Sequence, residues 1–319
     1  MQLSNKAKGV LCGSIAAISY GTNPLGALYL YDVGLNVDSV LLYRYALAAL
    51  MLAGIMKLRR IPFAIARREG LVLGILGILF AASSLQLFSS FHYMDAGIAS
   101  TLLFVYPIIV AVIMAIFFHE RVSLATILSI ALALCGIALL YKGDDGVELD
   151  IYGVILVMLS SLSYALYIVI VNRSGVRMSS VKLTFYVLLF GIATITVHSF
   201  IAEGSRLQPL TTPYMWFFAF ILALFPTVVS LVTMAISVQH IGSTPTAILG
   251  ALEPLTAVAI GVMVFGEPFT TRLASGIVLI LLGVTLIIAG KSLRTSHLYT
   301  LLHIRHKGDN DLHSNSDND

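Results

Sequence analysis

Ten long runs of apolar residues follow one another along the chain, and short polar segments that hold most of the charges separate them. A helix that crosses a bilayer needs about 20 predominantly apolar residues, and the runs have about that length. The pattern therefore predicts an all-α integral membrane protein with ten transmembrane helices. The expected spans are 9–30, 39–56, 71–91, 96–118, 123–141, 151–171, 180–201, 213–237, 243–265 and 271–290.

The cations predict how these spans are oriented. Taken alternately, one set of connecting segments and termini holds fifteen Lys and Arg residues, and the other set holds only Lys142, Arg206 and Arg272. Cytoplasmic segments carry an excess of such residues. We therefore expect a multi-pass protein of the cytoplasmic (inner) membrane with both termini in the cytoplasm. Two lysines before the first run resemble a signal peptide, but apolar sequence resumes after Pro24 and favours a retained span.

The second half of the chain repeats the first. A shift of 147 residues lays 97–143 on 244–290 without a gap, and 11 of the 47 aligned positions are identical. Earlier spans correspond at slightly different shifts, with Tyr20 on Tyr164. Because five spans is an odd number, the halves must enter the membrane from opposite sides, as in many alternating-access transporters. We expect two inverted five-helix repeats, over 1–145 and 146–290, and a partly disordered cytoplasmic tail over 291–319.

Composition excludes several classes of protein. Charged residues make up 11% of the chain, whereas a soluble domain has about 25%. The net charge of +3 comes from short clusters at span ends, which suit membrane lipid and offer no continuous surface for nucleic acid. The two cysteines lie in apolar runs, so we expect no disulfide and no metal site. No GxSxG, Walker A or HExxH motif occurs, so we expect no enzyme activity, no cofactor and no use of ATP.

A few residues carry a resemblance to a known family. They are Arg44 in the second span, Glu253-Pro254 in the ninth, Gly266-Glu267 at its end, and glycines 276, 283 and 290 in the tenth. With these features the chain resembles the drug/metabolite transporter superfamily, in its ten-span type with two EamA domains. The resemblance implies export of amino acids or other metabolites, or exchange of nucleotide-linked or phosphorylated sugars. One departure is that the first half has Tyr106-Pro107 where the second has Glu253-Pro254.

Two ionisable side chains, Arg44 and Glu253, lie well inside predicted spans. A charge at such depth costs at least about 2.5 kcal/mol and needs a partner, water or neutralisation. Glu253 is therefore a candidate contact for a substrate amine or a coupled proton, and the alternative is a structural carboxylate tied to Arg44 or to the backbone. Arg44 lies nearer a span end, so it could also snorkel to the membrane surface.

Four prolines interrupt spans. Pro107 and Pro254 occupy corresponding positions in the two halves and are candidates for helix breaks with a gating role, because broken helices expose backbone groups to a cavity. The alternative for this pair is a packing kink, and we expect a kink at Pro24 and Pro226.

Polar residues at helical spacing mark further faces of the spans. Such stripes line a site or serve interhelical packing, and the sequence leaves both open. The stripes include Ser83 and Gln86 in the third span and Tyr167 in the sixth, and the candidate binding residues also include Tyr20, Asn23, Tyr45 and Tyr106. We further expect Glu120 and Glu267 to favour the starts of the fifth and tenth helices. The glycines of the tenth span predict close packing within the chain or in a homodimer.

Together these patterns predict a secondary transporter, an exporter of a small polar metabolite such as an amino acid. We expect its site between the halves, formed by the first, third, fourth, sixth, eighth and ninth spans, with proton coupling open. One alternative is a sugar-phosphate or nucleotide-sugar exchanger. Such anionic substrates would need several cations in the cavity, and the sequence offers a single buried arginine. The other is a membrane partner protein that transports nothing.

Overall fold

The computed structural model describes residues 5–119, 124–141, 150–176, 178–202, 204–286 and 288. Throughout these residues the regular secondary structure is helical, without a strand, which confirms the all-α prediction. Every one of the ten expected spans coincides with a helix or with helices joined end to end. Seven of them are long and apolar enough to cross a membrane by length and composition, and two shorter apolar helices cover Thr126–Leu139 and Thr271–Leu286. The predicted tail, 291–319, lies outside the described residues.

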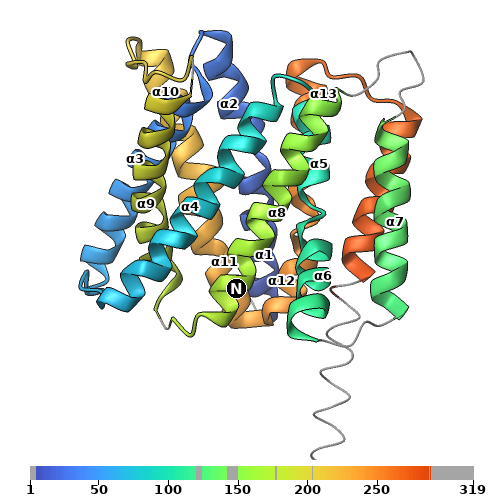
Figure 1. Cartoon of the computed structure of the whole chain (residues 1–319), viewed down its shortest axis with the longest axis horizontal. Helices are drawn as coiled ribbons and strands as arrows, with labels where there is room; N and C mark the ends of the chain where they lie inside the picture. Colours follow the sequence, from blue (N-terminus) through green and yellow to red (C-terminus); the bar gives the residue numbers. More distant parts are fainter. Residues whose placement is uncertain are drawn as a thin grey trace, which may run out of the picture.

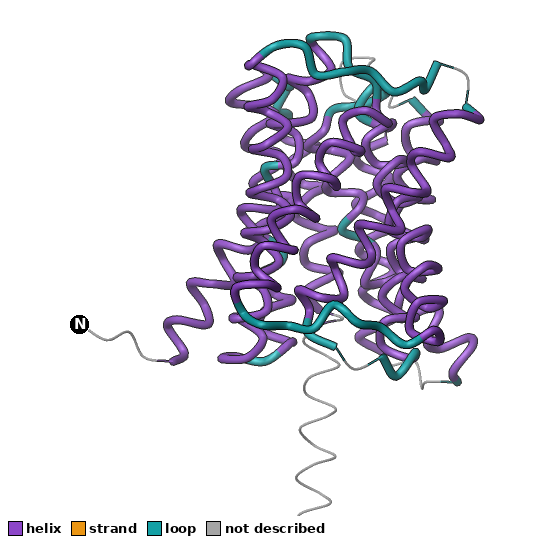
Figure 2. Tube along the Cα trace, turned by 90° about the vertical axis from the view of Figure 1, so that its left-hand side faces the viewer, coloured by secondary structure: helices purple, strands orange, loops and turns teal. Residues whose placement is uncertain are grey.

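The helices run roughly side by side and their connections gather at the two ends of the bundle (Figures 1 and 2). The first half contains α1 (Asn5–Gly21), α2 (Asn23–Asp32), α3 (Val37–Leu58), α4 (Arg67–Ser90), α5 (Ala96–Leu103), α6 (Tyr106–Phe118) and α7 (Leu124–Tyr141). The second contains α8 (Ile151–Arg173), α9 (Ser180–Ile201), α10 (Pro213–Ala223), the π-helix η1 (Leu224–Val229), α11 (Ser230–Ile241), α12 (Ser243–Leu249) and α13 (Leu252–Phe265). The helix Thr271–Leu286 follows α13.

The fourth and ninth spans are each broken at corresponding positions. Residues 104–105 separate α5 from α6, and residues 250–251 separate α12 from α13, so the shift of 147 residues brings the two breaks to within one residue of each other. Pro107 and Pro254 lie in the first turn after each break, where a missing N–H costs no helical hydrogen bond. The helix breaks predicted at these prolines are therefore present.

The first and eighth spans are interrupted in different ways. At the junction of α1 and α2, the Thr22 hydroxyl donates to the Ser19 carbonyl (2.7 Å) and the Asn23 amide donates to the Tyr20 carbonyl (2.9 Å). These bonds satisfy carbonyls that the break leaves free, and Pro24 begins α2. Pro226 instead lies within the π-helix η1, so the eighth span continues through a wider turn.

Contacts between helices come in matched pairs: when each helix is replaced by its counterpart in the other half, one contact becomes another contact of the structure. The pair α1–α11 has a counterpart in α8–α4, α1–α13 has one in α8–α6, and α10–α3 has one in α4–α9, while α3–α9 exchanges within itself. Glycines occupy equivalent contacts: Gly9 packs against His240 and Ile241, and Gly153 against Tyr93 and Met94. The packing therefore has the approximate twofold relation of an inverted repeat.

The glycines Gly136 and Gly283 make the same relation visible between α7 and the last helix. A Cβ on Gly136 would lie 2.8 Å from the Gly276 carbonyl oxygen, and a Cβ on Gly283 would lie 2.8 Å from that of Ser129. Absence of a side chain at both positions lets the two helices approach closely. This glycine face of the last helix is thus occupied by packing within the chain.

The two ends of the bundle differ in charge. One end, which we call the basic end, holds the start of α1, the loop 59–66 and the turn 174–176, with Arg59, Arg60, Arg67 and Arg68 beside them. The opposite end holds the loops 33–36, 91–95 and 266–270. The pair α3–α9 is tied at both ends, because the Asn36 amide donates to the Arg206 carbonyl (2.7 Å) and the Lys182 ammonium donates to the Ala64 carbonyl (2.7 Å).

Candidate functional site

A cavity of about 180 Å³ lies between the halves, near the middle of the bundle. Its wall takes residues from the six spans expected for the site and also from α3 and α9, the second and seventh spans. One part of the wall is aromatic and consists of Tyr20, Phe80, Phe104, Tyr106, Tyr164 and Tyr167. The polar part includes Arg44, Thr184, Thr227, Ser230, Thr246 and Glu253.

The cavity extends from the middle of the bundle toward the basic end. Gly13, Thr184 and Met234 line it, and each lies in the half of its span nearer that end. In contrast, α2 and α10, which form the halves of their spans nearer the opposite end, contribute no residue to the wall. The cavity is therefore asymmetric along the axis of the bundle.

Glu253 carries the acidic group of the cavity. It lies in the first turn of α13, directly after the break, and its N–H donates to the Gly250 carbonyl (2.9 Å). The positive end of the helix dipole favours an anion at this position. No hydrogen bond or ion pair joins the carboxylate to any other described residue, so the structural alternative, a carboxylate tied to Arg44, does not describe this conformation.

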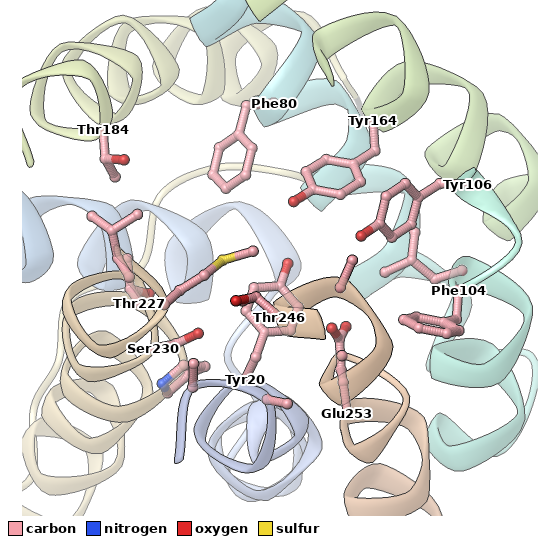
Figure 3. A pocket seen from close by; sticks show the side chains of 18 of the residues that line it. Tyr20, Phe80, Phe104, Tyr106, Tyr164, Thr184, Thr227, Ser230, Thr246 and Glu253 are labelled. Atoms are coloured by element: carbon pink, nitrogen blue, oxygen red, sulfur yellow. The ribbon is translucent and has the colours of Figure 1, made fainter. Parts of the chain in front are cut away.

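Hydroxyl groups and rings surround this carboxylate. Figure 3 shows Glu253 and the hydroxyls of Tyr20, Tyr106 and Tyr164 turned toward the same space, and all three tyrosines lie within electrostatic range of Glu253. The rings pack on one another: Tyr106 meets Tyr164 edge to face (4.7 Å between centroids), and Tyr164 stacks on Tyr167 (5.7 Å). An anionic group among π faces is an environment that attracts an organic cation.

Arg44 is 2% exposed and does not snorkel to the membrane surface. Its Nε donates to the Thr227 hydroxyl (3.1 Å), and its guanidinium lies over the Phe88 ring, 5.3 Å from the centroid. The bond crosses from α3 in the first half to η1 in the second. Arg44 therefore both lines the cavity and joins the halves, because the π-helix brings Thr227 to it.

Five of the nine predicted binding residues line the cavity: Tyr20, Arg44, Tyr106, Tyr167 and Glu253. Asn23, Tyr45, Ser83 and Gln86 do not, and their side chains lie against neighbouring helices.

Helix-to-helix hydrogen bonds explain three of these four positions. The Ser83 hydroxyl lies 3.0 Å from that of Ser160, Gln86 accepts from Ser163 (3.3 Å), and the Tyr45 hydroxyl donates to Ser84 (2.6 Å). The Asn23 amide nitrogen donates across the junction to the Tyr20 carbonyl of α1 (2.9 Å), and its buried Oδ1 has no hydrogen-bond partner among the described residues. For these stripes the structure favours packing, which the sequence had left open.

Sequence reasoning missed part of the wall. Phe80 and Phe104 gave no signal, because an apolar ring inside a span looks the same whether it faces lipid or a cavity. Tyr164 did have a signal, since the internal repeat pairs it with Tyr20, and both line the cavity. Thr184 and Thr246 lie near the starts of their spans, where polar residues are common, and they belonged to no predicted polar stripe.

Glu267 lies elsewhere than predicted. Its carboxylate accepts hydrogen bonds from the Ala96 N–H (2.9 Å) and the Gly97 N–H (3.3 Å) at the start of α5. It therefore stabilises a helix N-terminus of the other half of the chain, and the expectation that it favours the start of the tenth helix was wrong. Its counterpart Glu120 lies outside the described residues.

Comparison with known proteins gives the chain a family. The sequence profile described as the EamA-like transporter family matches twice, over residues 7–142 and 151–289. A protein of Archaeoglobus fulgidus named an uncharacterized transporter is 30% identical over 192 residues, which are 60% of this chain and 66% of that protein. The uncharacterized transporters YcbK and YvbV of Bacillus subtilis are 22% identical over 274 residues (83% of this chain, 88% of YcbK) and 23% identical over 196 residues (61% and 64%).

For the archaeal protein and YvbV, the matched stretch is thus less than two thirds of that protein's length. A solved crystal structure shares the fold, with a TM-score of 0.64 and 15% identity over 88% of this chain and 96% of that one. Because the two profile matches together cover most of the residues, the chain belongs to the EamA-like transporter family.

Proposed function

We propose that the protein is a secondary transporter that exports a small polar metabolite, such as an amino acid, across the cytoplasmic membrane by alternating access. The observation that supports this most is the cavity between the halves, which holds a carboxylate without a described partner in the middle of the bundle. A protein that only bound a partner would have no reason to keep this charge in the membrane.

Alternating access follows from exchange of the two halves. In an inverted repeat, each half can adopt the conformation of the other, which turns a cavity open on one side into one open on the other. The excess of cations supports a cytoplasmic location for the basic end. The cavity in this conformation then extends toward the cytoplasm, where a substrate for export is loaded.

The chemistry of the wall supports an amine. Glu253 offers a carboxylate to an ammonium group, and the surrounding rings add cation–π attraction. Arg44 lies on the same wall and suits the carboxylate of a zwitterion, which favours an amino acid. A phosphorylated sugar is a weaker candidate, because Arg44 is the single cation among the described residues that line the cavity.

Glu253 is also the candidate for proton coupling. A carboxylate can bind a proton or an ammonium group, but not both at once. Movement of one across the membrane is then coupled to movement of the other in the opposite direction. Such an exchange would use the proton gradient and need no ATP site. The coupling belongs to the same residue as binding, so one substitution tests both.

The test is counterflow in liposomes that hold the purified protein and a mixture of metabolites. Glu253→Gln should abolish exchange of the transported amine, and Glu69→Gln should not, because Glu69 is a half-buried carboxylate outside the cavity that accepts from the Ala66 N–H (2.8 Å). If Glu253→Gln exchanged the amine as fast as the parent protein at every pH, the proton-coupling hypothesis would be wrong. Absence of exchange of any solute by the parent protein would favour the membrane partner instead.

A further inference from the structure

We propose that Glu267 forms a clasp that holds the opposite end of the protein closed, and that the clasp must release before the cavity can open there. The clasp consists of the Glu267 carboxylate and the N–H groups of Ala96 and Gly97. It rests on the alternating access proposed above, because it gives that cycle a named closed contact at one end.

The clasp joins the two halves through a helix terminus. One carboxylate oxygen of Glu267 accepts from Ala96 (2.9 Å) and the other from Gly97 (3.3 Å), which are the first two residues of α5. The first N–H groups of a helix have no partner within it, and a carboxylate there also gains from the helix dipole. Glu267 belongs to the second half and α5 to the first, so this contact breaks if the halves separate at this end.

The backbone around Glu267 is shaped to receive the carboxylate. Gly266 turns the chain back with a φ of +69°, and the Glu267 N–H donates to the Gly261 carbonyl (3.0 Å). A Cβ on Gly261 would collide with the Glu267 carboxylate, and a Cβ on Gly97 would lie 3.1 Å from its Oε2 and 2.9 Å from the Val258 Cα. Two glycines, one from each half, therefore make the space that the clasp occupies.

The clasp lies where the protein is closed in this conformation. Between the cavity and the opposite end, Tyr29 of α2 packs on Phe218 of α10 (4.5 Å between centroids) and on Phe265 of α13 (5.3 Å). Glu267 follows Phe265 by two residues and fastens the same helix to α5. The hydrogen bonds between α3 and α9 differ from it, because they tie that pair at both ends and cannot distinguish a closed end from an open one.

The charge of the clasp depends on pH. Burial and the nearby Asp95 raise the pKa of Glu267 above its ordinary value of 4.5, against the two backbone hydrogen bonds. Asp95, at the start of α5, is the charged neighbour in the described part of the chain, and burial raises its pKa as well. The charged form of Glu267 is thus lost at a higher pH than for an exposed glutamate, so a falling pH weakens the clasp.

Cysteine labelling measures whether this end opens. In a chain with Cys12→Ser and Cys135→Ser, the single reporter Leu103→Cys lies on the cavity wall. A membrane-impermeant maleimide is added from the side of the opposite end. Glu267→Gln should raise the labelling rate by about threefold or more, in the range that a carboxylate contributes at a helix N-terminus. Gly261→Ala should do the same without removing the charge, because it displaces the carboxylate.

Asp150→Asn is the matched control. Asp150 also accepts from a helix N-terminus, the Tyr152 N–H (2.8 Å), but within its own helix α8, so labelling should not change. Lowering the pH from about 7.5 to about 5.5 slows the maleimide reaction itself because the thiolate fraction falls, so the quantity compared is the labelling rate of the parent divided by that of Glu267→Gln at each pH, and this ratio should rise as the pH falls. Thermal unfolding in detergent shows that each variant is folded.

Equal labelling of the parent, Glu267→Gln and Gly261→Ala would overturn the clasp and make the contact simple packing. The assay needs no substrate, so it is independent of transport. If the parent exchanges no solute but Glu267→Gln still opens the reporter, the proposed transport fails and the clasp stands. If the parent exchanges solute but Glu267→Gln and Gly261→Ala label Leu103→Cys at the rate of the parent, the proposed transport stands and the clasp alone is wrong.

Discussion

The two halves of the protein differ most where they face the cavity. The shift of 147 residues pairs Phe80 with Thr227 and Tyr106 with Glu253, and all four side chains line the wall. The first half thus supplies rings and the second supplies a hydroxyl and an acid at equivalent places. At the contact of α7 with the last helix, in contrast, both halves keep a glycine. These two pairs on the cavity wall are unequal although Tyr20 and Tyr164 keep the same residue there, whereas the glycine pair at the helix contact is equal.

Exchanging the unequal pair should have the largest effect. In Tyr106→Glu with Glu253→Tyr, the carboxylate moves to the equivalent place in the first half, but Phe80 and Thr227 do not exchange with it. Depriving a buried ammonium of its partner costs about 2–5 kcal/mol, so we expect at least about a 30-fold loss of exchange in the liposome assay. Tyr106→Phe, which keeps the ring, is the control. Full activity of the double variant would mean that the halves are interchangeable at the site.

The equal pair should respond equally. Gly136→Ala and Gly283→Ala each place a Cβ about as close to a backbone oxygen, so each should destabilise the protein by about 1–3 kcal/mol. Gly54 is the control, because a Cβ there meets nothing within 4 Å, and Gly54→Ala should stabilise its helix by up to about 1 kcal/mol. Thermal unfolding in detergent measures all three. Clearly unequal losses for the first two would show that the contact is not symmetric.

The smallest effect concerns a pair of identical residues. Ser83 corresponds to Ser230, but Ser83 bonds Ser160 while Ser230 lines the cavity. Ser83→Ala should cost about 1 kcal/mol of stability with little change in exchange. Ser230→Ala should change stability by less than about 0.5 kcal/mol and should raise the substrate concentration for half-maximal exchange. A loss of exchange in Ser83→Ala with no change in Ser230→Ala would mean that the solute meets Ser83 and not Ser230.

Much of the fold could be predicted from the sequence because its determinants are local. A span is recognised by a run of about 20 apolar residues. The duplication is recognised by Pro, Glu and Gly residues that recur at one fixed spacing. The breaks at residues 104–105 and 250–251 were predictable for the same reason, since Pro107 and Pro254 mark them. What each break does for transport is a separate question that local sequence does not answer.

The site was predictable only in part. Glu253 was found because a charge inside a span is rare and costly. The partners of Arg44 and Glu267 were not, because Thr227 and Gly97 lie 183 and 170 residues away along the chain. Stripes such as Ser83 and Gln86 were ambiguous, since a polar face looks alike whether it meets a cavity or another helix.

The π-helix η1 absorbs one residue of the eighth span. A π-turn contains one residue more than an α-turn, so the helices before and after it keep about the rotation that an uninterrupted helix would give them. Loss of a single residue from Leu224–Val229 would therefore restore a regular helix and leave Ser230 and Met234 on the wall, but it would shift the residues of the wider turn itself, Thr227 among them. The length of this turn thereby decides whether the Thr227 hydroxyl can meet Arg44 and join the two halves.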